Sequence, residues 1–288
     1  MRADSSREQR AELSRVATEW VKRNPFLYGL ARGARLWAGA HLARPRTVAG
    51  VPGRVHPNDI MFATAGGDRK GAYLGDGRNA LSLLDDALTA VDRRVEDVES
   101  WLDFGCGYGR VLRFLVERAD PQAIWVTDWD HEAAAFCVAE FGVHVFHPAR
   151  GGTPVDADGF DVAYAFSILT HLPERAAVDV MALLGRVVRP GGLLVFTTHG
   201  ETSVTWAPEL GRWCAGLAPA IRDEVSRNGF AYRSYPYYRG NGYGLAWHAP
   251  SYVAEVMDRL HGDGLQPVSF LPGSFGRHQD TFVYRRAS

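Results

Sequence analysis

Short apolar runs, bounded by polar and glycine-rich turns, recur through the middle of the chain. Their length and their content of β-branched and aromatic residues predict buried strands, and the segments between them predict helices. Strands that alternate with helices indicate a mainly parallel sheet with helices on both faces. The predicted strands are residues 101–104, 123–127, 143–146, 160–166 and 193–199.

The end of the chain follows a different pattern. Residues 251–260 fit an amphipathic helix, and the apolar runs 268–271 and 281–284 are joined by the turn-rich residues 272–276. Two strands in this arrangement predict an antiparallel hairpin. The expected fold is therefore α/β: a doubly wound, Rossmann-like sheet of seven strands that ends in an antiparallel hairpin.

Two segments lie outside this pattern. The start of the chain has helical character broken at Asn24-Pro25, which predicts an N-terminal helical cap over residues 1–60, before a main domain of residues 61–288. An insertion, residues 201–248, follows the fifth strand, and its second half is dense in aromatic residues. Such residues can wall a site for an organic acceptor or form the private core of the insertion. The first helix of the main domain is predicted at residues 81–91.

A glycine-rich turn directly follows the first predicted strand. Gly105, Gly107 and Gly109 stand at alternate positions before a helix that begins near residues 111–112. Glycines let the backbone approach a ligand, and the N–H groups of the next helix point at it, so the turn indicates a nucleotide-type cofactor. A dinucleotide fingerprint needs a glycine three residues after Gly107, where this chain has Arg110. Asp103, just before the turn, would repel a pyrophosphate but suits a cationic amino-acid group.

Further motifs follow in order. The second predicted strand ends at Asp128, about 20 residues past the turn, where a carboxylate can accept hydrogen bonds from both ribose hydroxyls. NAD enzymes share this feature, so it supports a nucleoside without choosing the cofactor. After the fourth strand stands Phe-Ser-Ile-Leu-Thr-His-Leu, residues 166–172, and Arg-Pro-Gly-Gly, residues 189–192, precedes the fifth strand.

Together these motifs, over roughly residues 98–200, resemble those of the class I S-adenosylmethionine-dependent methyltransferases. The resemblance implies S-adenosylmethionine as cofactor and S-adenosylhomocysteine as product, and a closing antiparallel hairpin is also how this fold ends in the family. It implies that Asp128 binds the ribose and that Trp129 lies beside the adenine. The cofactor-binding residues expected from it are Asp103, Gly105, Gly107, Gly109, Asp128, Trp129 and Phe166.

Methyl transfer to a hydroxyl or an amine also requires removal of a proton, for which histidine is suited. His171 follows the fourth strand and His199 ends the fifth, and strand ends in such sheets face the ligand. Some sugar-amine methyltransferases carry a histidine at the acceptor in a segment similar to residues 166–172, which favours His171 over His199. A purely structural role is the alternative for each. The expected substrate contacts are Tyr237, Tyr238, Tyr243 and His248.

Departures from the family pattern narrow the prediction. The third strand is followed by no acid until Asp156, so we expect backbone groups and Trp129 to read the adenine. No cluster of acids of the metal-assisted type can be assembled, so no metal is expected. The Asn-Pro-Pro-Tyr signature of enzymes that methylate amino groups of nucleic acids and proteins is absent, since residues 165–168 read Ala-Phe-Ser-Ile.

Composition adds limits. The chain has 288 residues and a formal net charge of −1, which gives no indication of a nucleic-acid-binding surface. Its three cysteines have no metal-ligand spacing, no apolar run reaches transmembrane length, and the polar start is no signal peptide, so a cytoplasmic location is expected. Mixed charges in the N-terminal helical segment argue against membrane binding.

Four interpretations follow from the sequence. The first is an O- or N-methyltransferase acting on a small organic acceptor, such as a natural product or a sugar. The others are a methyltransferase acting on RNA or protein, a dinucleotide oxidoreductase, and a methyltransferase-like protein that binds without catalysis. The expected partner is a small-molecule methyl acceptor, with no nucleic acid and no membrane, and a homo-oligomer stays open.

Overall fold

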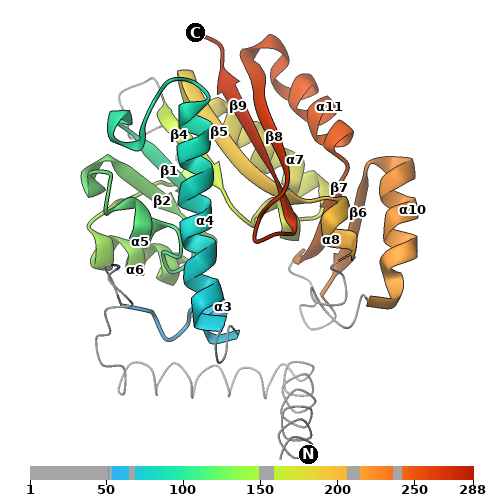
Figure 1. The fold of residues 1–288 in the computed structure, drawn as a ribbon, viewed down its shortest axis with the longest axis horizontal. Coiled ribbons are helices and arrows are strands. Elements are labelled where there is room, and N and C mark those ends of the chain that lie inside the picture. The colour runs from blue at the N-terminus through green and yellow to red at the C-terminus, as the bar shows by residue number, and fades with distance from the viewer. Residues whose placement is uncertain (1–50, 52–53, 65–68, 149–158, 206–214, 236–241) are drawn as a thin grey trace, which may run out of the picture.

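Seven strands form one sheet in the order β3-β2-β1-β4-β5-β9-β8. The computed structural model describes residues 51, 54–64, 69–148, 159–205, 215–235 and 242–288. Strands β1 to β5 are mutually parallel, whereas β9 pairs antiparallel with both β5 and β8, which confirms the predicted doubly wound sheet with its terminal hairpin (Figure 1). The strands are β1 (Trp101–Phe104), β2 (Ile124–Thr127), β3 (His144–Val145), β4 (Phe160–Ala165), β5 (Val188–His199), β8 (Leu265–Phe275) and β9 (Gln279–Arg286).

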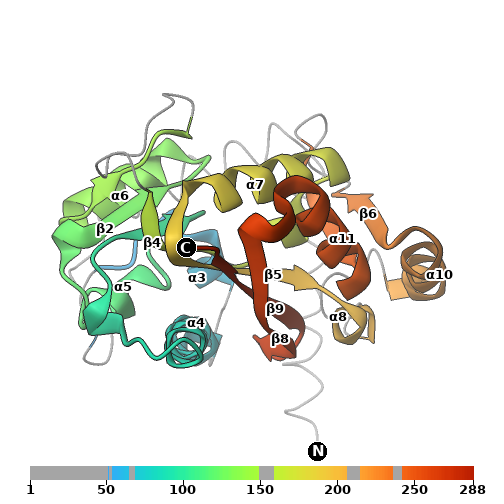
Figure 2. The ribbon, with the colours of Figure 1, turned by 90° about the horizontal axis from the view of Figure 1, so that it is seen from above.

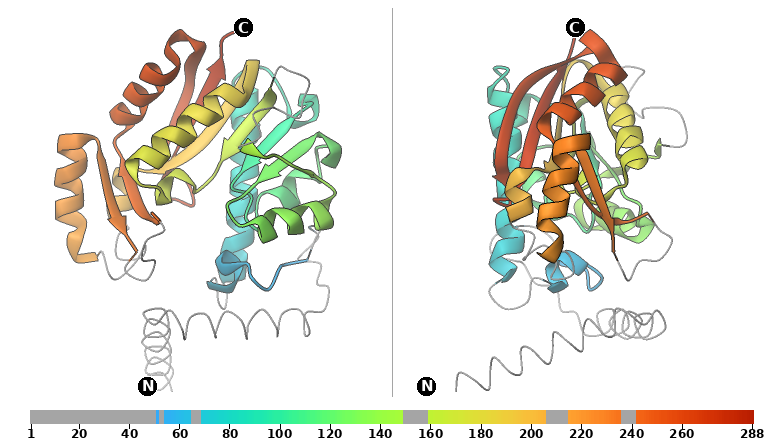
Figure 3. Two further views of the ribbon diagram at one scale, coloured as in Figure 1. Left: turned by 180° about the vertical axis from the view of Figure 1, so that it is seen from behind. Right: turned by 90° about the vertical axis from the view of Figure 1, so that its right-hand side faces the viewer.

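Helices cover both faces of the sheet (Figures 2 and 3). One face packs against α4 (Arg69–Thr89), α5 (Leu112–Leu115) and α6 (His131–Phe141), and the other against α7 (Glu174–Val187) and α11 (Pro250–His261). The remaining helices are α3 (Ile60–Thr64), α8 (Glu201–Thr205) and α10 (Ala218–Asn228), with 3-10 turns η1 (Val95–Asp97), η2 (Pro121–Ala123), η4 (Leu169–His171), η5 (Ala215–Leu217) and η6 (Gly262–Gly264). None of the helices in these described ranges is long and apolar enough to cross a membrane.

Strand alternation divides the core into two layers. In β5, Leu193 and Val195 belong to the layer under α4 to α6, and Leu194 and Phe196 belong to the layer under α7 and α11. Successive residues of a strand point to opposite faces, and a parallel sheet is buried on both. This double burial explains why the strands appear in the sequence as continuous apolar runs rather than as alternating patterns.

Helix α4 begins twelve residues earlier than the predicted start at residue 81. The first half of α4 contains Gly71, Gly75 and Gly77, which lower its helix propensity. For this reason the sequence pattern did not predict a helix before residue 81. Gly77 has a packing reason: a Cβ there would collide with the carbonyl of Arg110 and stand within 3 Å of the ring of Phe114. Glycine therefore lets α4 pass close to the start of α5.

Two segments expected to lie outside the strands are part of them. Residues 272–276 were expected to connect the terminal hairpin, but β8 continues to Phe275, and its register against β9 shifts between Leu271 and Phe275. Residues 189–192 lie within β5, and the register between β4 and β5 shifts beside them. Bulges absorb proline and glycine where a regular ladder could not.

The insertion predicted after the fifth strand contains a separate antiparallel hairpin of β6 (Phe230–Ser234) and β7 (Gly244–His248). Together with α8 and α10 it encloses a small core that includes Ile221 and Trp247. The boundaries at residues 60, 201 and 248 stay predictions, and residues 1–50 lie outside the described ranges.

A buried carboxylate links the starts of the neighbouring strands β4 and β5 to residues that precede β1. Asp161 of β4 is fully buried and forms ion pairs with Arg93 at 2.8 Å and Arg189 at 2.6 Å, and it accepts a hydrogen bond from the Glu99 N–H. Removing one member of a buried charge network leaves the others without compensation.

We expect Asp161→Ala to lower the free energy of unfolding by about 2–3 kcal/mol in urea titrations. The exposed pair of Asp223 with Arg227 provides a matched control, and Asp223→Ala should cost much less. Equal losses in the two variants would contradict a structural role for the Asp161 network.

Candidate functional site

The glycine-rich turn is held closely on two sides and open at its centre. Gly105, Gly107 and Gly109 have positive φ values of 87°, 49° and 77°, which favour glycine. A Cβ on Gly105 would collide with the side chain of Ile168, and one on Gly109 would stand 2.5 Å from the ring of Phe141. A Cβ on Gly107 would meet no atom of the described residues within 4 Å. The turn therefore presents its backbone to open space at Gly107.

Asp128 stands beside this opening. Its Oδ2 accepts a hydrogen bond of 2.7 Å from the Gly107 N–H, and its Oδ1 accepts one of 2.8 Å from the Asp130 N–H. Burial raises the pKa of Asp128, and these two hydrogen bonds oppose the rise. Each carboxylate oxygen keeps acceptor capacity for another donor. The next residue, Trp129, is 97% exposed, so its indole is open to a ligand.

Asp103 lies beneath the turn, in β1, and is only 3% exposed. Its Oδ2 has no hydrogen-bond partner among the described residues. Burial raises the pKa of Asp103 to about 7, although the nearby Tyr164 hydroxyl and Arg110 oppose the rise. A buried acceptor of this kind can bind a cation or another donor placed over the turn.

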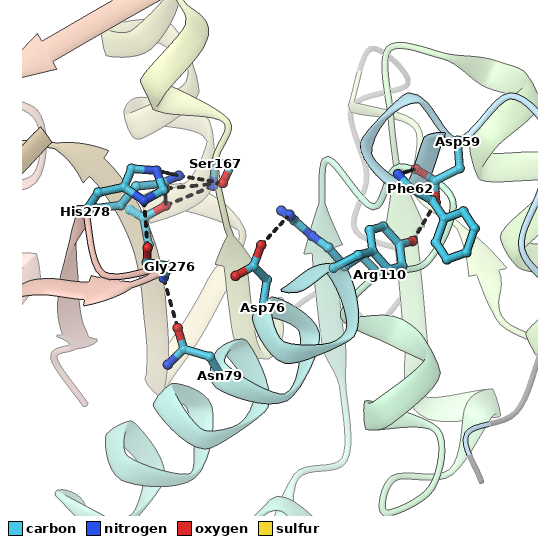
Figure 4. A network of polar contacts seen from close by, with 11 residues as sticks. Asp59, Phe62, Asp76, Asn79, Arg110, Ser167, Gly276 and His278 are labelled. Carbon is cyan, nitrogen blue, oxygen red and sulfur yellow. Dashed lines mark hydrogen bonds and ion pairs between the residues drawn. The ribbon is translucent and has the colours of Figure 1, made fainter. Parts of the chain in front are cut away.

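The segment after β4 is held by a polar network (Figure 4). Ser167 has a φ of 61°, uncommon for a residue with a side chain, and its N–H donates to Oγ1 of Thr197 at 2.8 Å. The Gln279 Nε2–H donates to Oγ of Ser167 at 2.9 Å, and Oε1 of Gln279 accepts from the Thr197 hydroxyl at 2.7 Å. Phe166, expected at the cofactor, is 6% exposed and packs on the rings of Tyr164 and Phe275.

The structure brings His171 and His199 together at the ends of β4 and β5. Their ring centroids are 6.3 Å apart. Nδ1 of His171 lies 2.9 Å from the carbonyl oxygen of Gly244, and Nδ1 of His199 lies 3.2 Å from that of Ala246. A carbonyl oxygen only accepts, so in each neutral ring Nδ1 carries the proton and Nε2 carries the lone pair.

The two histidines differ in access. His199 is 1% exposed, and burial together with the neighbouring His171 and His278 holds its pKa well below the usual value. His171 is half-buried, and burial lowers its pKa too. Its ring stacks on that of Tyr243, with centroids 4.9 Å apart, and Tyr243 is 40% exposed. His171 therefore lies at the more open end of the pair.

His248 is placed differently. It is 1% exposed and packs against the rings of Phe230 and Tyr252. Burial lowers its pKa to about 3. Neighbouring residues of a strand face opposite sides, and Trp247 contacts His199, so His248 faces away from the two histidines. Its predicted contact with substrate stays a prediction, as do those of Tyr237 and Tyr238, which lie outside the described residues.

The described part of the predicted N-terminal cap packs on the glycine-rich turn. The ring of His56 stacks on that of Tyr108, with centroids 4.5 Å apart and planes inclined by 4°. The Tyr108 hydroxyl donates to Asp130, and the Asn58 side chain donates to Glu132. No local pattern in the sequence indicates these contacts, since His56 and Asn58 flank a proline in a segment typical of loops.

Comparison with known proteins decides the family. The sequence matches a family model described as a methyltransferase domain over residues 74–234, more than half of its 288 residues. The chain belongs to the methyltransferase family. This methyltransferase is of the S-adenosylmethionine-dependent class I type, as the sequence motifs implied, and the oxidoreductase interpretation is wrong. A search of curated proteins found no match.

Solved structures of methyltransferases are similar to this chain at low identity. The magnesium protoporphyrin IX methyltransferase of Synechocystis, with bound S-adenosylhomocysteine, is 12% identical with a TM-score of 0.50, over 95% of this chain and 100% of that one. The N-methyltransferase NodS of Bradyrhizobium japonicum is 14% identical with a TM-score of 0.46, over 80% and 93%. The CcbJ methyltransferase of Streptomyces caelestis is 16% identical with a TM-score of 0.47, over 74% and 90%.

The residues around the turn fit S-adenosylmethionine. Among the described residues, the space left open at Gly107 gives room for a ligand against the backbone, and Oδ2 of Asp103, which has no partner there, suits an ammonium group. Asp128 offers acceptors suited to ribose hydroxyls. In the described ranges, no group of three histidine, cysteine or acidic side chains is arranged to hold a metal ion.

We expect Asp128→Ala to weaken S-adenosylhomocysteine binding by roughly 10- to 100-fold, because the hydrogen bonds to the ribose and to the Gly107 N–H are lost together. Calorimetric titration measures the change. Asp120→Ala, which removes an exposed acid from the η2 turn, is the control. Wild-type affinity in folded Asp128→Ala protein would defeat the assignment.

Asp103 makes a pH-dependent contribution to stability. Its folded pKa of about 7 lies above its ordinary value of 3.8, so between these values the folded state holds a proton that the unfolded chain has released. The contribution of Asp103 to the free energy of unfolding of the wild type is therefore complete at low pH, and it is lost as the pH rises through about 7.

Asp103→Asn cannot ionise, so it should not lose stability as the pH rises through about 7. Relative to the wild type, its free energy of unfolding should rise by about 2–3 kcal/mol from about pH 5 to about pH 8, as measured by urea denaturation. A difference between the two proteins that stays constant over this range would show that Asp103 ionises normally.

Proposed function

We propose that this methyltransferase transfers a methyl group to a hydroxyl or amine of a small organic acceptor, and that His171 accepts the acceptor's proton. The observation that carries the proposal is the hydrogen bond between His171 Nδ1 and the Gly244 carbonyl, which leaves Nε2 as the basic nitrogen. His171 follows the buried Phe166 by five residues. It lies in the same segment as Ile168, whose side chain packs over Gly105 of the turn.

The chemistry needs few groups. When bound, S-adenosylmethionine supplies a methyl group on a positively charged sulfur. Asp128 and the glycine-rich turn would hold this cofactor, the acceptor oxygen or nitrogen would take the methyl group from it, and Nε2 of His171 would take the proton that the acceptor loses. Burial holds the pKa of His171 below 6.5, so the ring is neutral at pH 7 and able to accept. Positioning of the acceptor supplies much of the remaining rate.

His199 has a supporting part in this proposal. Its burial keeps it from direct contact with solvent, and its bond to Ala246 ties β5 to the hairpin that carries Tyr243. Tyr243 offers a partly exposed aromatic ring next to His171, which suits an acceptor with an apolar or planar part. Tyr237 and Tyr238 are kept as candidate substrate contacts.

A small acceptor is favoured over RNA by the net charge of −1. A cytoplasmic location is also part of the proposal, because the three cysteines are too few for a disulfide framework.

We expect His171→Ala to lower kcat by about 100-fold or more while leaving the affinity for S-adenosylhomocysteine within about 2-fold. Methyl transfer to a panel of phenols, amines and amino sugars gives the first number, and calorimetry gives the second. His147→Ala, an exposed histidine after β3, is the matched control. Unchanged turnover with an accepted substrate would remove His171 from the reaction.

The pH profile tests the same role independently. Because the neutral ring is the active form, kcat/KM should be level from about pH 7 to about pH 8 and fall at lower pH, through a pKa below 6.5. His171→Ala should lose this acidic limb. A limb that persists in the variant would belong to another group.

A further inference from the structure

Arg110 has no assigned contact with cofactor or acceptor in the function proposed above. It directly follows the third glycine of the turn, and its side chain is 15% exposed. The guanidinium carbon lies 5.6 Å from the centre of the Phe275 ring, and Nη1 stands 3.4 Å from Oδ2 of Asp76 (Figure 4). A large charged side chain is thus held in the site between one aromatic ring and one carboxylate.

The course of α4 brings Asp76 to this place. Gly77 permits the close approach of α4 to the Arg110 carbonyl. Farther along the helix, Oδ1 of Asn79 accepts a hydrogen bond of 3.0 Å from the Gly276 N–H, which ties α4 to the turn between β8 and β9. Asp76 is therefore fixed between two turns of the site.

The charges here are incompletely paired. Strong arginine–carboxylate pairs are short and bidentate, whereas Arg110 and Asp76 share a single contact of 3.4 Å. Burial raises the pKa of Asp76, with Arg110 as the main opposing influence, so compensation of this carboxylate is partial. Asp103 adds a buried Oδ2 without a partner among the described residues. The guanidinium of Arg110 and the carboxylates of Asp76 and Asp103 can therefore each form further hydrogen bonds or ion pairs with a ligand.

These groups lie across the turn from the expected ribose site. Asp128 follows β2 and binds the turn at Gly107, whereas Arg110 leans on Phe275 at the end of β8, which contacts Phe166 after β4. Strands β2 and β4 flank β1 on opposite sides. A ligand with its ribose at Asp128 that crosses Gly107 therefore reaches Arg110 with its other end.

We infer that Arg110 binds the carboxylate of the amino-acid end of S-adenosylmethionine, and that Asp76, together with Asp103, receives its ammonium group. That end of the cofactor is a zwitterion with both charges on one carbon. A guanidinium next to a carboxylate presents the complementary arrangement, and its planar fork suits a carboxylate. The inference does not depend on His171 or on the acceptor, so it can fail without the proposed function failing, and the reverse also holds.

Calorimetric titration with three ligands tests it. S-adenosylhomocysteine carries the whole amino-acid end, S-adenosyl-3-thiopropylamine keeps the amine without the carboxylate, and 5′-methylthioadenosine lacks both. Arg110→Met should weaken S-adenosylhomocysteine binding by roughly 10- to 100-fold and leave binding of the other two unchanged. Asp76→Asn should weaken both amine-bearing ligands and leave 5′-methylthioadenosine unchanged.

Arg78→Met is the matched control, because Arg78 also lies over a phenylalanine ring, that of Phe114, and is exposed on the same helix as Asp76. It should bind all three ligands as the wild type does. If Arg110→Met weakens all three ligands equally, Arg110 only shapes the turn. If it binds S-adenosylhomocysteine as the wild type does, the carboxylate is held elsewhere. Either result overturns the inference.

Discussion

Close approach of backbone to side chains at the glycine-rich turn is the constraint on which the site depends. Three elements converge there through contacts that a single added methyl group would prevent: the segment after β4 at Gly105, α6 at Gly109, and α4 at Gly77. The Gly107 N–H then fixes the carboxylate of Asp128. Because Ile168 covers Gly105 three residues before His171, the same packing also sets the distance between the cofactor turn and the candidate base.

The hairpin of β6 and β7 is docked on the sheet by His171 and His199, the two candidate catalytic residues. Carbonyls two residues apart on a strand point to the same side, so Gly244 and Ala246 offer one edge of β7 to His171 and His199. The other edge pairs with β6. Docking through Nδ1 directs both Nε2 atoms away from the hairpin. The same two hydrogen bonds therefore attach the insertion to the sheet and determine which nitrogen of each histidine carries the proton.

The parts of this structure that local sequence determines were predicted. Apolar runs and the glycine turn predicted a doubly wound seven-stranded sheet with a terminal antiparallel hairpin, which the structure confirms. The ends of the fourth and fifth strands were expected to carry His171 and His199, and the structure brings the two rings within 6.3 Å of each other. The first half of α4 was missed because tertiary contact at Gly77 outweighs helix propensity. Gln279 was missed because its partner Ser167 is 112 residues away, and no local pattern marks a hydrogen bond over such a separation.

The network around Gln279 explains how the segment after β4 keeps an unfavourable backbone. A residue with a side chain held at positive φ costs of order 1 kcal/mol or more, and such residues persist only where their surroundings over-determine them. Ser167 is bonded through its N–H to Thr197 and through its hydroxyl to Gln279, and both partners are buried at the ends of β5 and β9. Satisfied polar networks of this kind hold one geometry where apolar packing would allow several. The turn at Ser167 directs the chain toward Gly105 and then toward Gly244, so the network fixes the path of the chain that leads to His171, the candidate base.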